Sequence, residues 1–168
     1  MKLFASLVLL AATALATPIA RATKKFQLKT SGASQPAHND LYIRTYHTGA
    51  GLNDAVLDKN GTNAPNIYFN GTQALFDLGT EFPWGMIAPG DTNYAAWEPI
   101  EVNAGGGSTG FSITKKGEFV WSEANGFGGW LVCDWYHNGP QLFYLYKYYT
   151  PVIPSSCSKV ELKPVYAK

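Results

Sequence analysis

The sequence predicts an all-β domain, an antiparallel β-sandwich of about ten short strands, with a closed β-barrel as the alternative. Short apolar or alternating segments are separated by turn residues roughly every eight to twelve positions. No window shows the sustained periodicity of an amphipathic α-helix. Aromatic residues make up 14% of the chain and charged residues only 15%, a balance typical of extracellular β-proteins.

The centre of the predicted sheet is the stretch Gly128–Tyr149. Its apolar runs, Trp130–Tyr136 and Leu142–Tyr149, flank a cluster of turn residues, His137–Pro140. Both faces of each run are largely apolar, as expected of strands that are covered on both sides. We therefore predict a central β-hairpin, and the two glycines at its entrance allow another backbone segment to approach closely.

The other predicted strands are short runs of apolar or alternating residues. In chain order they are Thr23–Thr30, Leu41–His47, Asn53–Asp58, Asn66–Phe69, Gln73–Leu78, Tyr94–Val102, Phe111–Thr114, Glu118–Trp121 and Lys159–Tyr166. Asn60-Gly61 and Asn70-Gly71 are predicted hairpin turns, because these residues tolerate the positive φ angles of a type I′ turn. Pro99 places its strand at an edge or at a bulge.

Residues 1–16 predict a secretory signal peptide, with residue 20 as the alternative boundary. A lysine and an apolar run precede Ala14-Leu15-Ala16, which has the small residues of a cleavage site. Residues 17–23 are then a flexible N-terminus, and residues 24–168 form a single all-β domain. The apolar run is too short to span ~30 Å of hydrocarbon, and no second stretch is apolar enough. We therefore expect a secreted protein without a membrane span.

The chain contains two cysteines, Cys133 and Cys157. In a secreted protein the default expectation is that they form a disulfide. Closing a loop of about 25 residues would stabilise the fold by roughly 3 kcal/mol in the chain-entropy model. A metal site or a catalytic thiol is the disfavoured alternative, because the two residues lack CxxC spacing.

Asn60-Gly61-Thr62 and Asn70-Gly71-Thr72 both match the acceptor pattern for N-linked glycans. Both sites fall on predicted hairpin tips, where an oligosaccharyltransferase can reach the asparagine. The alternative is that each is simply a turn that carries a threonine. With a secretion signal present, we predict a glycan on at least one of Asn60 and Asn70.

The sequence carries no signature of a metal site or of a cofactor. Its three histidines, His38, His47 and His137, are far apart and lack metal-ligand spacing. The motifs HExxH and GxSxG are both absent. Asp134 and His137 could form an acid–base pair on the central hairpin, although a hydrogen-bonding role for Asp134 is the simpler interpretation.

The enzyme class that fits such a small secreted β-protein best is a glycosidase with two facing carboxylates. Alternation places Glu98 on one strand face with Ile100 and Val102, and Glu101 on the opposite face. Glu98 and Glu101 therefore cannot form one catalytic pair on a regular strand. Glu98 with Glu118, across two strands, is the remaining candidate, and no local motif singles it out.

Tryptophans near turns and edges are candidates for stacking on sugar rings, because pyranose faces present C–H groups to aromatic rings. Trp84, Trp97 and Trp121 lie at such positions. The alternative interpretation is that these rings belong to the core, as we expect for Trp130 and Trp135 on the central hairpin.

Four segments resemble a family of small secreted proteins from filamentous ascomycete fungi that is described as a domain of unknown function. They are His38–Tyr42, Tyr46–Ala55, Phe127–Trp135 and Pro154–Leu162, with the sequences HNDLY, YHTGAGLNDA, FGGWLVCDW and PSSCSKVEL. The resemblance covers about Lys25–Tyr166. It implies an extracellular or cell-wall setting and the same cysteine pair, and it brings no catalytic residues.

The function that we expect is therefore surface contact at a fungal cell wall or host interface, without catalysis. A glycan-binding module using exposed tryptophans is the first alternative, and a small β-sandwich glycosidase is the second. The expected partner is a cell-wall polysaccharide or a host surface component. The net charge of +1 provides no field that would attract nucleic acid.

Overall fold

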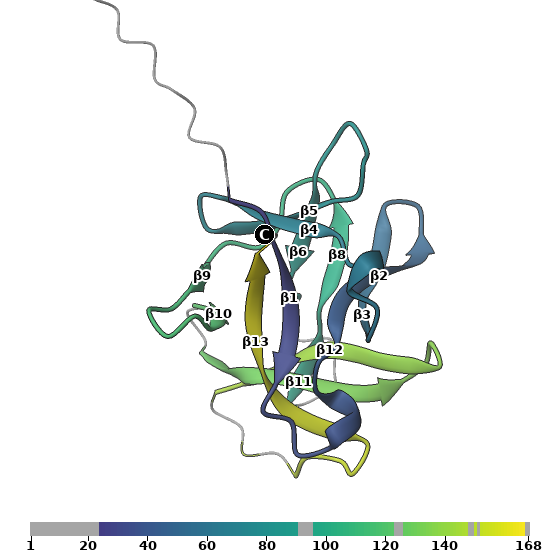
Figure 1. The fold of residues 1–168 in the computed structure, drawn as a ribbon, viewed down its shortest axis with the longest axis vertical. Coiled ribbons are helices and arrows are strands. Elements are labelled where there is room, and N and C mark those ends of the chain that lie inside the picture. The colour runs from purple at the N-terminus through teal and green to yellow at the C-terminus, as the bar shows by residue number, and fades with distance from the viewer. Residues whose placement is uncertain (1–23, 91–95, 123–125, 148–149, 151, 167–168) are drawn as a thin grey trace, which may run out of the picture.

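The computed structural model describes residues 24–90, 96–122, 126–147, 150 and 152–166 (Figure 1). The expected signal peptide and flexible N-terminus lie outside these residues. The described residues form thirteen strands and two short 3-10 helices, with no α-helix among them. In chain order the elements are β1 (Phe26–Ser31), η1 (Pro36–His38), β2 (Tyr42–Gly49), β3 (Leu52–Asp58), η2 (Gly61–Asn63), β4 (Asn66–Asn70), β5 (Gln73–Asp77), β6 (Trp84–Ile87), β7 (Trp97–Pro99), β8 (Glu101–Ala104), β9 (Phe111–Ile113), β10 (Phe119–Trp121), β11 (Phe127–Trp135), β12 (Gly139–Tyr146) and β13 (Cys157–Tyr166).

Nine of these strands close into an antiparallel barrel in the order β1, β4, β5, β6, β8, β3, β12, β11 and β13. The barrel closes because β13 pairs with two strands. Val160 of β13 lies opposite Trp130 of β11, and Leu162 lies opposite Thr30 of β1. The predicted all-β class is confirmed. Of the two predicted architectures, the structure has the closed barrel, which was the alternative to the sandwich. Closure removes the open edges at which a sheet could pair with another chain.

The four remaining described strands extend the barrel wall. Strand β2 pairs with β3 over most of its length and touches β1 at Lys29 and Tyr42. Strand β7 pairs with β12, while β9 and β10 form a short ribbon that meets β13 at Phe119 and Leu162. Figure 1 shows this ribbon on the outside of β13.

Aromatic rings dominate the barrel interior. Phe119 stacks on Phe111 and on Trp130, with ring centroids 5.5 and 5.7 Å apart. Trp121 meets Tyr144 edge to face at 4.9 Å. Such pairs contribute about 0.5–1.5 kcal/mol each beyond the burial of their area. Their fixed geometries therefore help to specify how the interior packs.

Strands β11 and β12 form the central hairpin, as predicted, with Asn138 at a positive φ of 54° in the turn. Both faces of the hairpin are buried. Val132 and Leu142 point into the barrel core, whereas Leu131 and Phe143 belong to a second cluster on the outer face. The apolar character of both faces thus follows from two separate layers of packing.

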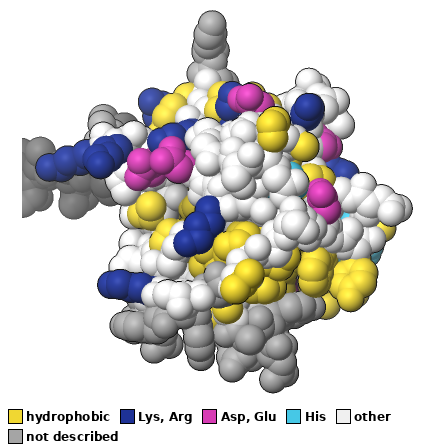
Figure 2. Space-filling model, turned by 90° about the horizontal axis from the view of Figure 1, so that it is seen from below, with side chains coloured by type: hydrophobic (Ala, Val, Ile, Leu, Met, Phe, Trp, Pro, Cys, Tyr) yellow, Lys and Arg dark blue, Asp and Glu magenta, His cyan; other side chains and the backbone are white. Residues whose placement is uncertain are grey.

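The predicted disulfide lies in this outer cluster. Cys133 and Cys157 are directly opposite each other on β11 and β13, and their sulfurs are bonded. Trp97, Trp135 and Ile153 pack against the cluster and remain partly exposed. Figure 2 looks at the molecule from below, the end where β11 and β12 lie, and shows hydrophobic side chains gathered on one part of that surface.

Close backbone approach at the entrance of the hairpin is also confirmed. A Cβ atom on Gly128 would lie 2.7 Å from the carbonyl oxygen of Tyr146, far closer than packing allows. The strand register shifts between Phe127 and Gly129, and Gly129 has a φ of 121°. This is a β-bulge that only glycine accommodates without strain.

The predicted hairpin at Asn60-Gly61 is wrong. Residues Gly61–Asn63 form η2, and the flanking strands β3 and β4 pair with other strands of the described sheet. Asn60 has a φ of −88°, and its Oδ1 accepts a hydrogen bond from Thr62 N–H at 3.0 Å. The asparagine therefore caps a 3-10 turn. Asn70-Gly71, in contrast, is the tip of the β4–β5 hairpin, with Gly71 at a φ of 60°.

Strand β6 is not among the predicted strands. It pairs with β5 and β8 to complete one wall of the barrel. A Cβ atom on Gly85 would lie 2.3 Å from the backbone nitrogen of Gly107, so the glycine-rich loop rests directly on this strand. Among the described residues, no helix has the length and apolar character needed to cross a membrane.

Candidate functional site

Two of the three predicted stacking tryptophans are buried. Trp84 and Trp121 are only 9% and 7% exposed. Their Nε1–H groups donate to Thr80 Oγ1 at 2.9 Å and to the carbonyl oxygen of Thr109 at 2.8 Å. Trp97 is half-buried against the outer cluster. Trp84 and Trp121 therefore belong to the core, as the alternative interpretation predicted.

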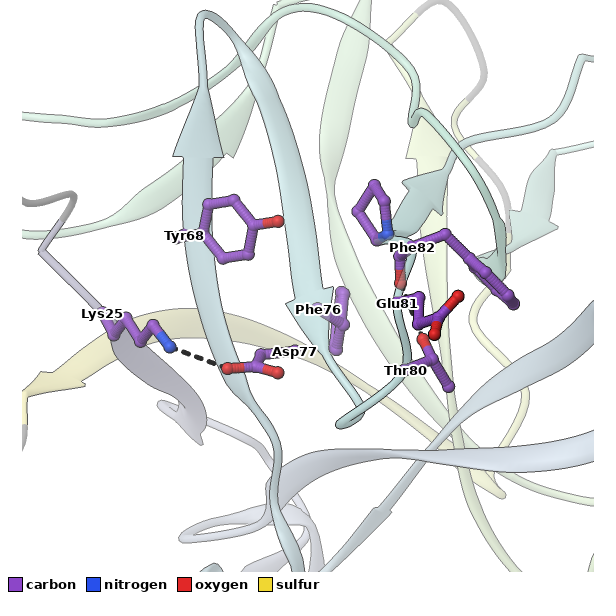
Figure 3. A pocket seen from close by; sticks show the side chains of 8 residues that line it. Lys25, Tyr68, Phe76, Asp77, Thr80, Glu81 and Phe82 are labelled. Carbon is purple, nitrogen blue, oxygen red and sulfur yellow. Dashed lines mark hydrogen bonds and ion pairs between the residues drawn. The ribbon is translucent and has the colours of Figure 1, made fainter. Parts of the chain in front are cut away.

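Trp84 nevertheless contacts two residues, Thr80 and Phe82, that line a pocket. Its ring contacts that of Phe82, with centroids 5.6 Å apart, and its hydrogen-bond partner Thr80 lies on the pocket wall. The pocket has a volume of about 260 Å³ and is built from the chain entering β1, from β4 and β5, and from the β5–β6 loop. Its lining residues are Lys25, Tyr68, Phe76, Asp77, Thr80, Glu81, Phe82 and Pro83 (Figure 3).

Strand alternation and the loop together place the aromatic side chains of this pocket. Phe76 points into the core and forms the buried floor. Tyr68 points outward from β4, and Figure 3 shows its hydroxyl directed toward the β5–β6 loop on the other side. Phe82 lies on that loop and is 49% exposed. Two accessible rings therefore flank a buried third.

The polar side chains of the pocket are held by specific interactions. Lys25 Nζ lies 2.7 Å from Asp77 Oδ2, a contact drawn in Figure 3. The hydrogen bond from Lys25, helped by the backbone N–H of Gly79, lowers the pKa of Asp77. The same bond raises the pKa of Lys25, so both groups stay charged. Thr80 Oγ1 donates to the carbonyl oxygen of Phe82 at 2.6 Å and fixes the loop.

Glu81 is different from its neighbours. Its side chain is exposed, and it has no hydrogen-bond or ion-pair partner among the described residues. The pocket thus combines two partly exposed aromatic side chains, a fixed ion pair, a phenolic hydroxyl and a carboxylate that can accept hydrogen bonds. This combination suits a polar ligand that also has apolar C–H faces. The described residues contain no group of histidine, cysteine or acidic side chains that could hold a metal.

The candidate glycosidase pair does not share an environment. The predicted alternation is confirmed, because Glu98 is fully buried whereas Glu101 is half-buried and accepts a hydrogen bond from Asn103 at 2.7 Å. Glu98 lies opposite Tyr144 on the neighbouring strand. Glu118 directly precedes β10 and is partly exposed, with its Oε1 3.6 Å from Lys163 Nζ. Neither carboxylate lines the pocket described above.

Asp134 and His137 do not pair with each other. His137 Nε2 lies 2.6 Å from Asp54 Oδ2, and the ring of Tyr46 stacks on the imidazole at 3.9 Å. Asp134 Oδ1 instead lies 3.3 Å from Nε2 of His38. The proposed acid–base pair on the hairpin is therefore wrong, and the hydrogen-bonding role for Asp134 is the one observed. His38 and His137 therefore each meet an aspartate that is distant in sequence.

Ser158, His38 and Asp134 form a chain of contacts with the residue types of a catalytic triad. Ser158 Oγ lies 3.1 Å from His38 Nδ1. Ser158 is only 1% exposed, however, and its oxygen also accepts from the N–H of Gln35 and contacts Ser34 Oγ, each at 3.2 Å. A substrate cannot reach this hydroxyl. The network instead ties η1 to β13 beside the disulfide.

Both glycosylation candidates are sterically accessible. Asn60 precedes η2 and Asn70 ends β4, and both side chains are exposed. Thr62 and Thr72, the third residues of the two acceptor patterns, are exposed as well. Glycan attachment at these sites stays a prediction.

The fold and the pocket define a disulfide-linked antiparallel β-barrel with a small mixed polar and aromatic pocket in its wall. The chain matches the family model of a domain of unknown function, DUF7907, over residues 23–166. It belongs to this family, which confirms the predicted resemblance to a domain of unknown function. No curated protein and no solved structure matches the chain.

Proposed function

We propose that the chain is a secreted glycoprotein of a fungal cell wall or host interface that binds carbohydrate without catalysis. The signal-like segment 1–16, the exposed sites Asn60 and Asn70, and the disulfide support export to an oxidising compartment. Analysis of the exported protein by mass spectrometry tests this part. A mature chain starting at Thr17 with glycan mass on Asn60 or Asn70 is the expected result, and an intact, unglycosylated chain contradicts it.

The observation that carries the binding proposal is the pocket between Tyr68 and Phe82. Sugar rings have apolar faces and polar edges, so sites for them pair aromatic rings with fixed hydrogen-bonding groups. Here the Lys25–Asp77 pair and the Glu81 carboxylate supply those groups. Trp84, which was predicted to stack on a sugar, instead supports the pocket wall. It donates a hydrogen bond to Thr80 and packs on Phe82.

Binding without catalysis is favoured by the charge state of Asp77, a carboxylate that lines the pocket. A glycosidase needs one carboxyl group that stays protonated as the general acid. The hydrogen bond from Lys25 lowers the pKa of Asp77, so this group is ionised and cannot serve in that role.

Retention on insoluble polysaccharides tests the proposal. The mature protein is mixed with chitin, β-glucan or cellulose, and the bound fraction is measured with and without Phe82→Ala. Leu52→Ala is the matched control, because Leu52 is 50% exposed on a different hairpin and Phe82 is 49% exposed. We expect retention on one polymer, lost in Phe82→Ala and kept in Leu52→Ala. Absence of retention on every polymer, or equal retention of both variants, refutes the proposal.

A contact surface outside the pocket is the second candidate. Tyr136, at the tip of the central hairpin, is 81% exposed and packs edge to face on Trp135 with centroids 5.1 Å apart. An exposed ring held by a neighbour suits contact with a wall polymer or a host surface component. This candidate predicts that Tyr136→Ala, and not Phe82→Ala, abolishes retention on intact cell walls.

A further inference from the structure

We propose that the pocket is one end of a continuous groove that takes a linear glycan chain of several sugar units. This inference rests on the carbohydrate binding proposed above and adds the size and path of the ligand. The path runs from the Phe82 pocket, past Asp77 and Arg44, to His137 on the central hairpin.

Three hollows in the barrel surface are linked by shared lining residues. The first is the pocket of about 260 Å³, and Asp77 also lines a second hollow of about 550 Å³ beside η2. Arg44 lines this second hollow and also a third, of about 320 Å³, which reaches His137 and Pro140. Because Asp77 borders the first two hollows and Arg44 the last two, each hollow is next to the following one. Pockets for drug-sized ligands have volumes of roughly 300–1,000 Å³. The combined volume of the three hollows is therefore larger than a single sugar ring requires.

The middle of the groove presents unused hydrogen-bond donors. Arg44 Nε lies 2.6 Å from Asp58 Oδ2, and its side chain is 38% exposed. Apart from this ion pair, the guanidinium makes no hydrogen bond to a described residue. Lys59, on the wall of the third hollow, is exposed as well. The planar N–H groups of the Arg44 guanidinium can bridge adjacent hydroxyls of a sugar.

The far end repeats the aromatic character of the first pocket. Tyr46 is exposed and stacks on the imidazole of His137 at 3.9 Å, with the ring planes 22° apart. Asp54 orients that imidazole through its Nε2, and Nδ1 has no partner among the described residues. A fixed ring pair with an available nitrogen can stack on one sugar and hydrogen-bond to it. Aromatic surfaces therefore mark both ends of the path.

Chain length is the property that separates this inference from simple pocket binding. The dissociation constants of a disaccharide and a hexasaccharide, taken from the polysaccharide that retains the protein, are measured by calorimetry. We expect the hexasaccharide to bind about tenfold more tightly, because several groups add contacts along the chain. Equal affinity for both lengths overturns the groove and leaves the pocket proposal standing, whereas no binding of either sugar rejects both.

Variants locate the path. Arg44→Gln and Tyr46→Ala should weaken hexasaccharide binding about tenfold and leave the disaccharide unchanged, whereas Phe82→Ala should weaken both. Leu52→Ala is the control for Tyr46→Ala, because Leu52 lies on the same β2–β3 hairpin with a similar exposure, 50% against 41%, and is not part of the stacked Tyr46–His137 pair. Thermal unfolding midpoints show whether each variant is folded. Unchanged hexasaccharide affinity in both folded groove variants overturns the inference.

The acceptor asparagine Asn60 needs its own control. Thr62 and Asn63 line the second hollow, so a glycan on Asn60 would begin beside the groove. The calorimetry is therefore repeated with Asn60→Gln. Length dependence in either form of the protein supports the groove, and its absence from both forms overturns it.

Discussion

Removing the disulfide should cost this domain a large part of its stability. The perturbation is the double variant Cys133→Ala with Cys157→Ala, which deletes the bond between β11 and β13. The two cysteines are separated by 24 positions in the chain. The chain-entropy model assigns about 3–4 kcal/mol to closing a loop of that length. Both residues are buried in the outer cluster, so lost packing adds to this effect.

The magnitude matters because β13 is also the strand that closes the barrel. It pairs with β11 at its start and with β1 toward its end, so loosening the first contact weakens the second. For a domain of this size each kcal/mol shifts the unfolding midpoint by roughly 2–4 °C. We therefore expect a fall of about 10 °C in the midpoint.

Urea unfolding, followed by tryptophan fluorescence, measures the change in the free energy of unfolding. The proteins are compared with the same dependence of that free energy on urea concentration. Wild-type protein treated with a reducing agent is the matched control, because it loses the same bond without a substitution. A loss below about 1 kcal/mol in both cases would refute the reasoning, since the loop-closure effect would then be absent.

Three further predictions follow from single contacts. Because its lysine partner lowers the pKa of Asp77 from 3.8, the stability that this group provides is present above that pH and lost as pH falls through the lowered value. Asp77→Asn should therefore unfold more easily near neutral pH and show a shallower loss of stability in acid, as seen in midpoints across a pH series; an unchanged acid limb contradicts this. Ser158→Ala should cost about 1–3 kcal/mol, because buried His38 loses a hydrogen-bond partner, whereas the exposed control Ser112→Ala should be nearly neutral. Gly128→Ala should cost at least about 1–3 kcal/mol by chemical denaturation, because its Cβ would strike the carbonyl of Tyr146, and a neutral result would place that backbone elsewhere.

The candidate site could be predicted only in part. The sequence directs attention to aromatic residues beside turns, and Phe82-Pro83-Trp84 is one such run. It does not show which of these rings is accessible. Trp84 is buried because β6 pairs on both sides, and Phe82 is exposed because it lies in the loop before that strand. No local sequence pattern indicates that Tyr68 lines the pocket, since it does so only because β4 places it facing that loop.

The histidines show the same limit. Sequence distance alone leaves His137 without a partner other than nearby Asp134. In the fold, strand β3 brings Asp54 to His137, and η1 brings His38 to Asp134. These pairs join segments more than eighty residues apart, so no local pattern could indicate them.

By itself, the sequence determined the features that depend on neighbouring residues. The all-β class, the central hairpin, the opposite faces of Glu98 and Glu101, and the disulfide all follow from a two-residue period or from the count of cysteines. Tertiary structure decided whether the sheet closes, because that depends on β13 reaching β1 from the other end of the chain. It also decided where the surface hollows lie, since each hollow is lined by segments that are distant in sequence, and their contacts leave no periodic pattern in any one segment.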